Sequence, residues 1–151
     1  MMKHSEVSIR LLGENDWMVL ENVEADVFDY PVQADLAKEF LRDPRHHMVV
    51  AIDNNKVVGF ASGVHYVHPD KIAELFINEV GVAPTYQRQG IAKKMLKALL
   101  ARGKTLGCQE AWVATEPDNH AARALYTSVG GREDSNPFVL YLFSLEGELR
   151  S

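Results

Sequence analysis

Residues 78–92 read NEVGVAPTYQRQGIA and join the end of an apolar strand, a short polar loop and the start of an amphipathic helix. A helix start presents backbone N–H groups that lack intrahelical acceptors, together with the positive end of the helix dipole. Gly90 and Ala92 are small enough for a phosphate to approach the backbone, and Arg88 adds a positive charge nearby. The stretch therefore predicts a diphosphate-binding turn, with an ordinary strand–loop–helix connection as the alternative.

The helix that starts at this turn, Gly90–Leu106, has one apolar and one polar face. Its apolar face consists of Ile91, Ala92, Met95, Leu96, Leu99 and Gly103. Two other phosphate motifs do not fit this chain. It contains no G-x-G-x-x-G, and the tripeptide Gly103-Lys104-Thr105 lies late in a helix with Ala98 where a P-loop begins with glycine.

The remaining hydrophobic patterns predict a single α/β (α+β) domain over residues 1–151. We expect strands at Val7–Leu12, Met48–Ile52, Lys56–Val67, Glu74–Val82, Ala111–Thr115 and Phe138–Leu145, with a short one near Glu133. The other helices are expected at Asp16–Phe28, Gln33–Leu41 and Ala121–Val129. This order implies a mixed, mostly antiparallel sheet of six to seven strands, about four helices and one late parallel crossover.

Composition and charge narrow the classes of partner. The chain has 151 residues and a formal net charge of −5, and its basic residues are scattered, so we expect no nucleic-acid partner. No apolar run approaches the roughly 20 residues that span a bilayer, and the N-terminus lacks the long apolar centre of a signal peptide. We therefore expect a cytoplasmic protein without membrane association.

Cysteine and histidine usage predicts neither a disulfide nor a metal centre. Cys108 is the single cysteine, which excludes an internal disulfide and fits a reducing compartment. Its expected role is that of a small core residue. The six histidines show no spacing typical of metal ligands, so no metal is predicted.

A second group of residues occupies the later helix. It reads Asn119-His120-Ala121-Ala122-Arg123-Ala124-Leu125-Tyr126 and is followed by Gly130. Asp118 or Asn119 is the expected N-cap, and the small alanines permit close packing against the helix. Tyr126 lies one position off the apolar face, so its hydroxyl can reach a cleft at the sheet. Alternatively, Tyr126 is a packed aromatic residue with a solvated tip.

Together the two stretches resemble the GCN5-related N-acetyltransferase (GNAT) superfamily. Its diphosphate loop, R/Q-x-x-G-x-G/A, corresponds to Gln87–Ala92, and its later motif, N-x-x-A-x-x-L/F-Y-x-x-x-G-F, corresponds to residues 119–131. Gly131 replaces the usual phenylalanine of that motif, a change that affects packing after the helix. The order of elements also fits, so the resemblance spans nearly the whole domain.

The resemblance implies that acetyl-CoA is the co-substrate. Its pantetheine arm would enter a gap between the strand ending at Val82 and the next strand, often at a β-bulge, with which Gly81 is consistent. Backbone groups of the first strand would hold the pantetheine, and the N–H groups between Gln87 and Lys93 would hold the diphosphate. The predicted cofactor-binding residues are Val80, Gly81, Val82, Gln87, Arg88, Gln89, Gly90, Ile91, Ala92, Lys93, Asn119, Ala122 and Tyr126.

The resemblance also supplies candidates for acid–base catalysis. Glu79 lies just before the pantetheine contacts and is the candidate base that accepts the proton of the amine, directly or through water. Its alternative role is an exposed strand residue in a salt bridge. Tyr126 matches the family position of the acid that protonates the leaving thiolate. Since no suitably placed cysteine is evident, direct transfer to a primary amine is expected.

The segment Glu74–Asp134 looks most like aminoglycoside 3-N-acetyltransferases of this superfamily. An acidic rim that attracts a small cationic substrate is predicted at Glu79, Glu116, Asp118, Glu133 and Asp134. Asp118 is alternatively a helix cap, and the other acids are alternatively only solvated. Different acceptors remain open: a protein N-terminus, lysine, a polyamine or an amino acid. A CoA-binding module without catalysis is the rival of another class.

A homodimer is also possible, because many relatives dimerise. Phe138, Tyr141 and Phe143 of the last expected strand are candidates for such an interface, and core positions are the alternative.

Overall fold

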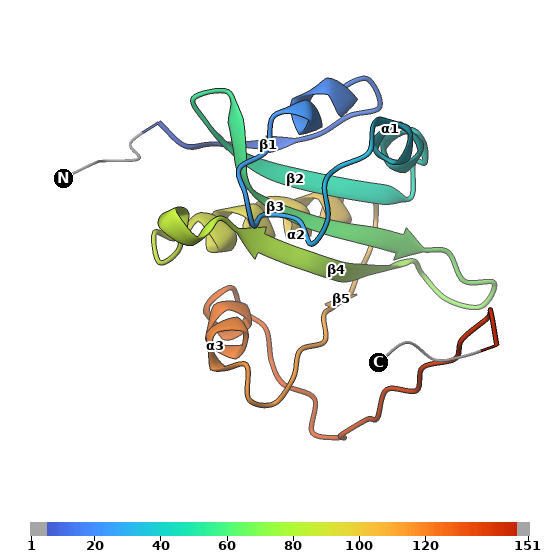
Figure 1. The fold of residues 1–151 in the computed structure, drawn as a ribbon. Coiled ribbons are helices and arrows are strands. Elements are labelled where there is room, and N and C mark those ends of the chain that lie inside the picture. Colours follow the sequence, from blue (N-terminus) through green and yellow to red (C-terminus); the bar gives the residue numbers. More distant parts are fainter. Residues whose placement is uncertain (1–5, 148–151) are drawn as a thin grey trace.

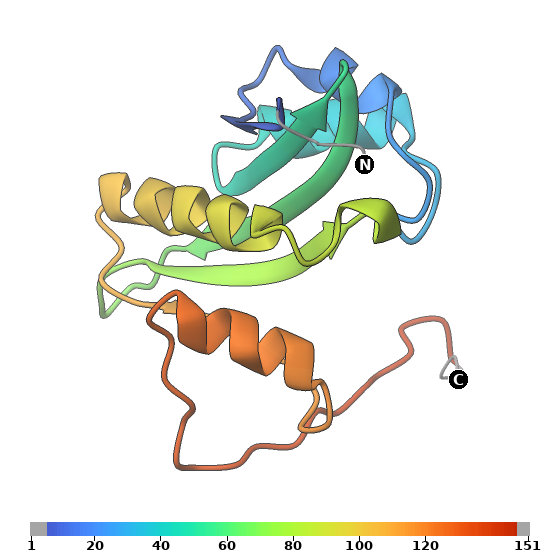
Figure 2. The same ribbon diagram turned by 90° about the vertical axis from the view of Figure 1, so that its left-hand side faces the viewer.

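A computed structural model describes residues 6–147 and shows a central sheet with helices on both faces (Figures 1 and 2). The strands are β1 (Ser8–Leu11), β2 (His46–Asp53), β3 (Lys56–Tyr66), β4 (Glu74–Val82) and β5 (Ala111–Trp112). The α-helices are α1 (Ala34–Arg42), α2 (Ile91–Thr105) and α3 (His120–Ser128), and the 3-10 helices are η1 (Trp17–Glu21) and η2 (Pro84–Tyr86). The α/β architecture predicted from the sequence is confirmed.

The five strands lie in the order β1-β2-β3-β4-β5, so each is beside its neighbour in the sequence. All pairs are antiparallel except β4 and β5, which run parallel. Parallel neighbours need a crossover connection, and here α2 supplies it. Because β4 leads directly into η2 and α2, the end of this strand and the start of the helix lie together at one end of the sheet (Figure 1).

Two hydrophobic clusters fill the space on the two faces of the sheet. Figure 2 shows α2 on one face, and η1 and α1 on the other. On the α2 face the fully buried side chains include Val49, Leu75, Met95, Leu96 and Leu99, which confirms the apolar face predicted for this helix. Burying a side chain of this size stabilises the fold by roughly 1.5–3 kcal/mol. The α2 cluster therefore fixes the helix start against the end of β4.

A β-bulge in β4 changes which residues face α2. Ser62 of β3 pairs with Glu79, but Gly63 pairs with Ile77, so Asn78 is an extra residue in β4. Before the bulge Leu75 and Ile77 pack against the α2 cluster, and after it Val80 and Val82 do so. The sequence placed the bulge at Gly81, and the structure places it at Asn78.

Gly81 serves a different purpose. A Cβ atom on Gly81 would lie 2.6 Å from the carbonyl oxygen of Val27, so the loop 22–32 rests directly on β4. The prediction of a helix over Asp16–Phe28 is wrong beyond Glu21. The backbone N–H of Val57 donates to Asn22 O, and the N–H of Glu24 donates to Val57 O, so the chain pairs with β3 there. These bonds take the place of helical ones.

The sheet is smaller than the six to seven strands expected, and the described residues contain three α-helices where about four helices were expected. Phe138–Leu145, predicted as the last strand, forms no strand, and neither do the residues near Glu133. In β5 only Ala111 and Trp112 pair with β4, so this sheet edge is short. A strand needs a partner edge for its backbone groups, and a two-residue edge provides little.

The segment after α3 instead runs as an extended chain separate from the sheet (Figure 1). Its large apolar side chains are 65–98% exposed at Phe138, Val139, Leu140, Tyr141, Leu142, Phe143 and Leu145. Core positions for Phe138, Tyr141 and Phe143 are therefore not found, and their role in a homodimer stays a prediction. Among residues 6–147, no helix has the length and apolarity that crossing a membrane requires.

One buried histidine makes the stability of this fold sensitive to acid. His47 of β2 is 3% exposed, and its Nε2 lies 2.7 Å from Nδ1 of His65 on β3. Burial, with smaller contributions from His65 and Arg102, lowers the pKa of His47 from 6.5 to about 4. Because the unfolded chain binds this proton more readily, unfolding becomes easier as the pH falls from 6.5 towards 4.

We expect His47→Gln to flatten this pH dependence. In the native protein, His47 removes roughly 2 kcal/mol of stability between pH 7.5 and pH 5, and glutamine does not titrate. Urea unfolding at the two pH values measures the difference. His120→Gln is the control, since His120 is exposed at the start of α3. Equal losses of unfolding free energy in wild type and His47→Gln would contradict the assignment.

Candidate active site

The edge of β4 beyond Phe76 is unpaired on the side of β5. The ladder between these two strands consists of Leu75↔Ala111 and Phe76↔Trp112, after which they diverge. The N–H of Ala83 donates to Val58 O of β3, and backbone groups of alternate residues point to opposite edges of a strand. Val80 and Val82 therefore direct their backbone groups away from β3, towards the edge of β4 on the β5 side.

The bulge is what makes this arrangement possible. Leu75 donates its N–H to Glu110 O, on the β5 side, so if Asn78 continued the regular alternation, the odd-numbered positions would go on facing that side. The bulge at Asn78 shifts the alternation by one residue, so the backbone groups of Val80 and Val82 point to the β5 side instead. The carbonyl of Val82 accepts a hydrogen bond from Nε2 of Gln87 at 3.0 Å, which ties the strand end to the following turn.

The turn before α2 presents backbone N–H groups for an anion. Arg88 and Gly90 have positive φ angles of 62° and 77°, while Gln89 between them does not. Such alternation makes consecutive N–H groups converge. The first helical bond described for α2 runs from Lys94 N to Gly90 O, so the N–H groups of residues 91–93 have no acceptor within the helix.

The charges around this helix start also favour an anion. The first turn of α2 contains no acidic residue, and Gly90, the N-cap, has no side chain to accept a hydrogen bond. Lys93 and Lys94 add positive charge at the positive end of the helix dipole, where cations are unfavourable unless an anion joins them. The turn therefore combines backbone N–H groups that have no acceptor within the helix with nearby positive charge, and binding of a diphosphate there stays a prediction.

Gln87 and Gln89 have a different role from the one suggested by the sequence alone. Their side-chain amides donate to backbone oxygens, Gln87 to Val82 and Gln89 to Thr85 at 3.2 Å. These bonds brace the loop on itself. Any contact of the two residues with an anion would therefore come from their backbone N–H groups.

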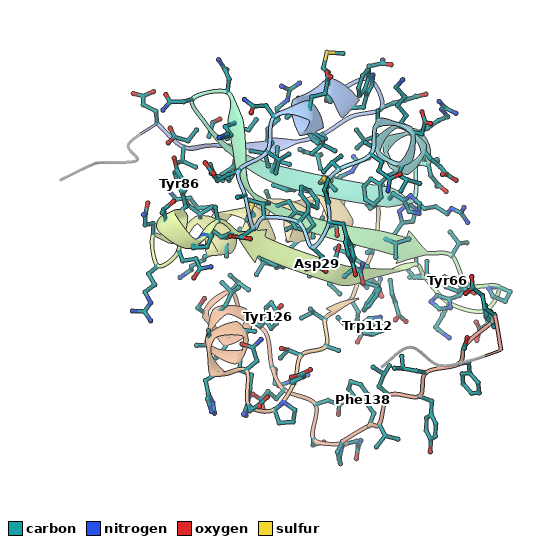
Figure 3. The ribbon with its side chains drawn as sticks, viewed as in Figure 1. Asp29, Tyr66, Tyr86, Trp112, Tyr126 and Phe138 are labelled. Carbon is teal, nitrogen blue, oxygen red and sulfur yellow. The ribbon has the colours of Figure 1, made fainter. Side chains whose placement is uncertain are left out.

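Helix α3 lies on the β5 side of β4 (Figure 1) and is capped by Asn119. The Asn119 Oδ1 accepts a hydrogen bond from the N–H of Ala122 at 3.1 Å, which settles the choice between Asp118 and Asn119 as cap. Tyr126 is half-buried and packs against the α2 cluster, and Figure 3 shows it between α3 and β4. Burial raises the pKa of the Tyr126 hydroxyl, so it keeps its proton.

Glu79 lies one residue past the bulge, between Asn78 and Val80. Because Val80 faces α2, Glu79 lies on the other face of β4, and its partner across the ladder is Ser62. Its side chain is exposed. Among the described residues it is in none of the ion pairs found, so the salt-bridge alternative gains no support.

The other predicted rim acids lie near α3, and all are exposed. Glu133 forms a two-point ion pair with Arg123, with N–O distances of 2.8 and 2.9 Å, which lowers the pKa of the Glu133 carboxyl. Asp134 accepts the N–H of Asn136 at 3.0 Å. Glu116 and Asp118 contribute backbone carbonyls to the loop that enters α3. The role of these four residues towards a substrate stays a prediction.

The loop 22–32 brings one acidic residue that the sequence did not predict, Asp29, to the face of the sheet that carries Glu79. Figure 3 shows Asp29 in front of the β3–β4 part of the sheet, which is the Glu79 face. The ring of Phe28 stacks on Phe60 with centroids 4.0 Å apart and anchors the loop there. Asp26, Asp29 and Pro31 are typical loop residues and were a signal against a long helix in this stretch.

Comparisons with known proteins agree with this geometry. Residues 15–130 match the Acetyltransferase (GNAT) family. The N-alpha-acetyltransferase RimI of Mycobacterium tuberculosis (strain H37Rv) is 33% identical over 128 residues, which are 82% of this chain and 77% of that protein. The chain therefore belongs to the GNAT acetyltransferase family, and it is an acetyl-CoA-dependent N-acetyltransferase.

Solved structures confirm the fold. An aminoglycoside acetyltransferase from an uncultured soil metagenomic sample has a TM-score of 0.75 and 24% identity, with 91% of this chain and 97% of that chain covered. AAC(6')-Iy in complex with the bisubstrate analogue CoA-S-monomethyl-acetylneamine has a TM-score of 0.74 and 22% identity, with coverages of 93% and 99%. The expected likeness to 3-N-acetyltransferases is therefore corrected, because the similar aminoglycoside acetyltransferase AAC(6')-Iy is a 6'-enzyme.

No group of three or more histidine, cysteine, aspartate or glutamate side chains suited to a metal ion occurs in the part of the chain that the structure describes.

Proposed function

We propose that this enzyme transfers the acetyl group of acetyl-CoA to a primary amine of a small cationic acceptor, such as an aminoglycoside, in a ternary complex. One observation carries the proposal: the edge of β4 at Val80 and Val82, with which β5 does not pair, leads within a few residues to the turn at Arg88–Lys93 and its N–H groups. The pantetheine arm and the diphosphate of CoA need such an extended edge and such a turn in succession.

Two parts of the chain bind two different parts of the co-substrate in this proposal. Backbone groups of Val80 and Val82 pair with the amide groups of the pantetheine arm, as a further strand would. The N–H groups of the turn and of the first residues of α2 bind the diphosphate, and Arg88 adds charge. When bound, acetyl-CoA supplies a thioester, the activated acetyl donor.

Two side chains would act on the amine and the thioester in this proposal. Glu79 precedes Val80 and accepts the proton of the attacking amine, directly or through water. Tyr126 approaches from α3 and donates its phenolic proton to the leaving thiolate. The raised pKa of Tyr126 supports this role, because a donor must be protonated at the working pH.

The acceptor is proposed from charge. Glu79 lies on the face over which the loop 22–32 with Asp29 passes, and both side chains are exposed. An exposed acidic surface raises the local concentration of a polycation. Glu116, Asp118 and Asp134 extend the exposed acids on the α3 side. A protein N-terminus is the second candidate acceptor, favoured by the 33% identity to an N-alpha-acetyltransferase.

The test is a thiol-release assay with acetyl-CoA and a panel of amines. We expect turnover with kanamycin- or gentamicin-type aminoglycosides to exceed that with polyamines, amino acids and peptides. Turnover with a peptide and none with aminoglycosides would replace the first candidate acceptor by the second. Calorimetry with CoA is run alongside, and failure to detect CoA binding would contradict the whole site.

A further inference from the structure

A hydrogen bond links the anion-binding turn to a distant hairpin. The hydroxyl of Tyr86 donates to Oδ2 of Asp53 at 2.6 Å, between residues 33 positions apart in the sequence. Tyr86 is the last residue of η2, immediately before the turn that starts at Gln87. Asp53 is the last residue of β2 and opens the Asn54-Asn55 turn into β3. Figure 3 shows Tyr86 at this end of the molecule, beside the start of α2.

The two partners are held in place by their surroundings. Asp53 is 7% exposed, and the ring of Tyr86 packs against the hydrophobic clusters on both faces of the sheet. The hydrogen bond to Asp53, together with burial, raises the pKa of Tyr86 to about 12. The phenol therefore keeps its proton and the bond persists throughout the usual assay range.

At its start this loop is also tied to β3, since the N–H of Ala83 donates to Val58 O, and the other hydrogen bonds described for it are local. The N–H of Tyr86 donates to Ala83 O, and the side chains of Gln87 and Gln89 donate to Val82 O and Thr85 O. Such bonds keep the loop's internal shape, but they move with it. The Tyr86–Asp53 bond instead fixes the loop to the β2–β3 hairpin, a part of the sheet that carries no predicted ligand contact.

We propose that Tyr86 is a positioning residue, whose hydrogen bond to Asp53 holds the N–H groups of residues 87–93 where the diphosphate of CoA binds. The inference rests on the proposed function of this turn. Tyr86 does not touch the thioester in this scheme. Loss of the bond should therefore weaken binding of the diphosphate and leave the acetyl-transfer step unchanged.

The test compares two acetyl donors. Acetyl-CoA carries the diphosphate, whereas S-acetylpantetheine does not. We expect Tyr86→Phe to lower kcat/KM for acetyl-CoA roughly five- to tenfold, the effect of one lost hydrogen bond. We expect kcat at saturating acetyl-CoA and kcat/KM for S-acetylpantetheine to stay within twofold of wild type. The acceptor is the best amine of the panel described above.

Variants of the partner complete the design. Asp53→Ala leaves the ring of Tyr86 in place and should reproduce the acetyl-CoA defect, and the double variant should be no worse than either single one. Asp53→Asn retains a carbonyl acceptor and should restore most of the wild-type value. Tyr66→Phe is the matched control, since Tyr66 ends β3 and is 62% exposed.

The outcomes separate this inference from the proposed function. If wild type binds CoA, and Tyr86→Phe and Asp53→Ala have the same kcat/KM for acetyl-CoA as wild type, the positioning role of Tyr86 is contradicted and the proposed function is not. Equal losses with both acetyl donors also contradict the positioning role, because they indicate general damage to the site. If wild type does not bind CoA, both the positioning role and the proposed function are contradicted. If Tyr86→Phe does not fold, the same two kcat/KM values, for acetyl-CoA and for S-acetylpantetheine, are compared between Asp53→Ala and Asp53→Asn instead. A loss in Asp53→Ala that is confined to acetyl-CoA and restored in Asp53→Asn supports the positioning role, and no such loss contradicts it.

Discussion

Replacing Tyr126 with phenylalanine is expected to lower kcat by ten- to ten-thousand-fold and to leave the affinity for CoA nearly unchanged. The hydroxyl is the proposed proton donor to the leaving thiolate, and loss of a general acid typically costs a factor within this range. The ring itself stays packed against the α2 cluster, so phenylalanine preserves the fold. Thiol release at saturating substrates gives kcat, and calorimetry gives the Kd of CoA.

The pH dependence adds a second criterion. Burial raises the pKa of Tyr126, and an acid is active below its pKa, so kcat of the wild type should not fall between pH 7 and pH 9. Tyr141→Phe is the control, because Tyr141 is 74% exposed and lies in the segment after α3. An effect of Tyr126→Phe confined to KM would instead assign this residue to binding.

Exchange of Glu79 for glutamine is expected to lower kcat about a hundredfold at pH 7, with a much smaller change in the Kd of CoA. Glutamine keeps the size of the side chain but cannot accept a proton from the amine. The amine must be neutral to attack, and its neutral fraction grows as the pH rises towards its own pKa. The defect should therefore shrink at high pH, which a kcat profile from pH 7 to pH 10 measures.

Glu14→Gln is the matched control for this variant. Glu14 is exposed and lies between β1 and η1, away from β4. Turnover of Glu79→Gln close to the wild-type value would remove Glu79 as the base. A defect that is independent of pH would assign it to acceptor binding alone.

The sequence predicted the central part of the site well, because local patterns determine it. The bounds Glu74–Val82 of β4 are those predicted, and α2 starts one residue after Gly90. The apolar period of α2 and the preference for small residues at its start are local properties. They need no knowledge of the rest of the chain.

The sequence failed where distant residues decide the backbone. The pairing of residues 22–24 with Val57 ended the expected long helix, and no local pattern announces such a contact. The bulge was placed at Gly81, since glycine in a strand often marks one, whereas its position at Asn78 follows from the register with β3. The Tyr86–Asp53 bond joins residues that only the folded sheet brings together.

The extra residue in β4 has a consequence for sequence variation in this chain. Insertions and deletions of one residue are tolerated in most surface loops, because a loop can absorb the change in length. Losing Asn78 from β4 would likewise be absorbed, because Ile77, Val80 and Val82 would then follow one another at a spacing of two in a strand without a bulge, and both valines would still face the helix. Position 78 is thus a place within β4 where the chain can shorten by one residue without moving Val80 or Val82 to the other face of the sheet.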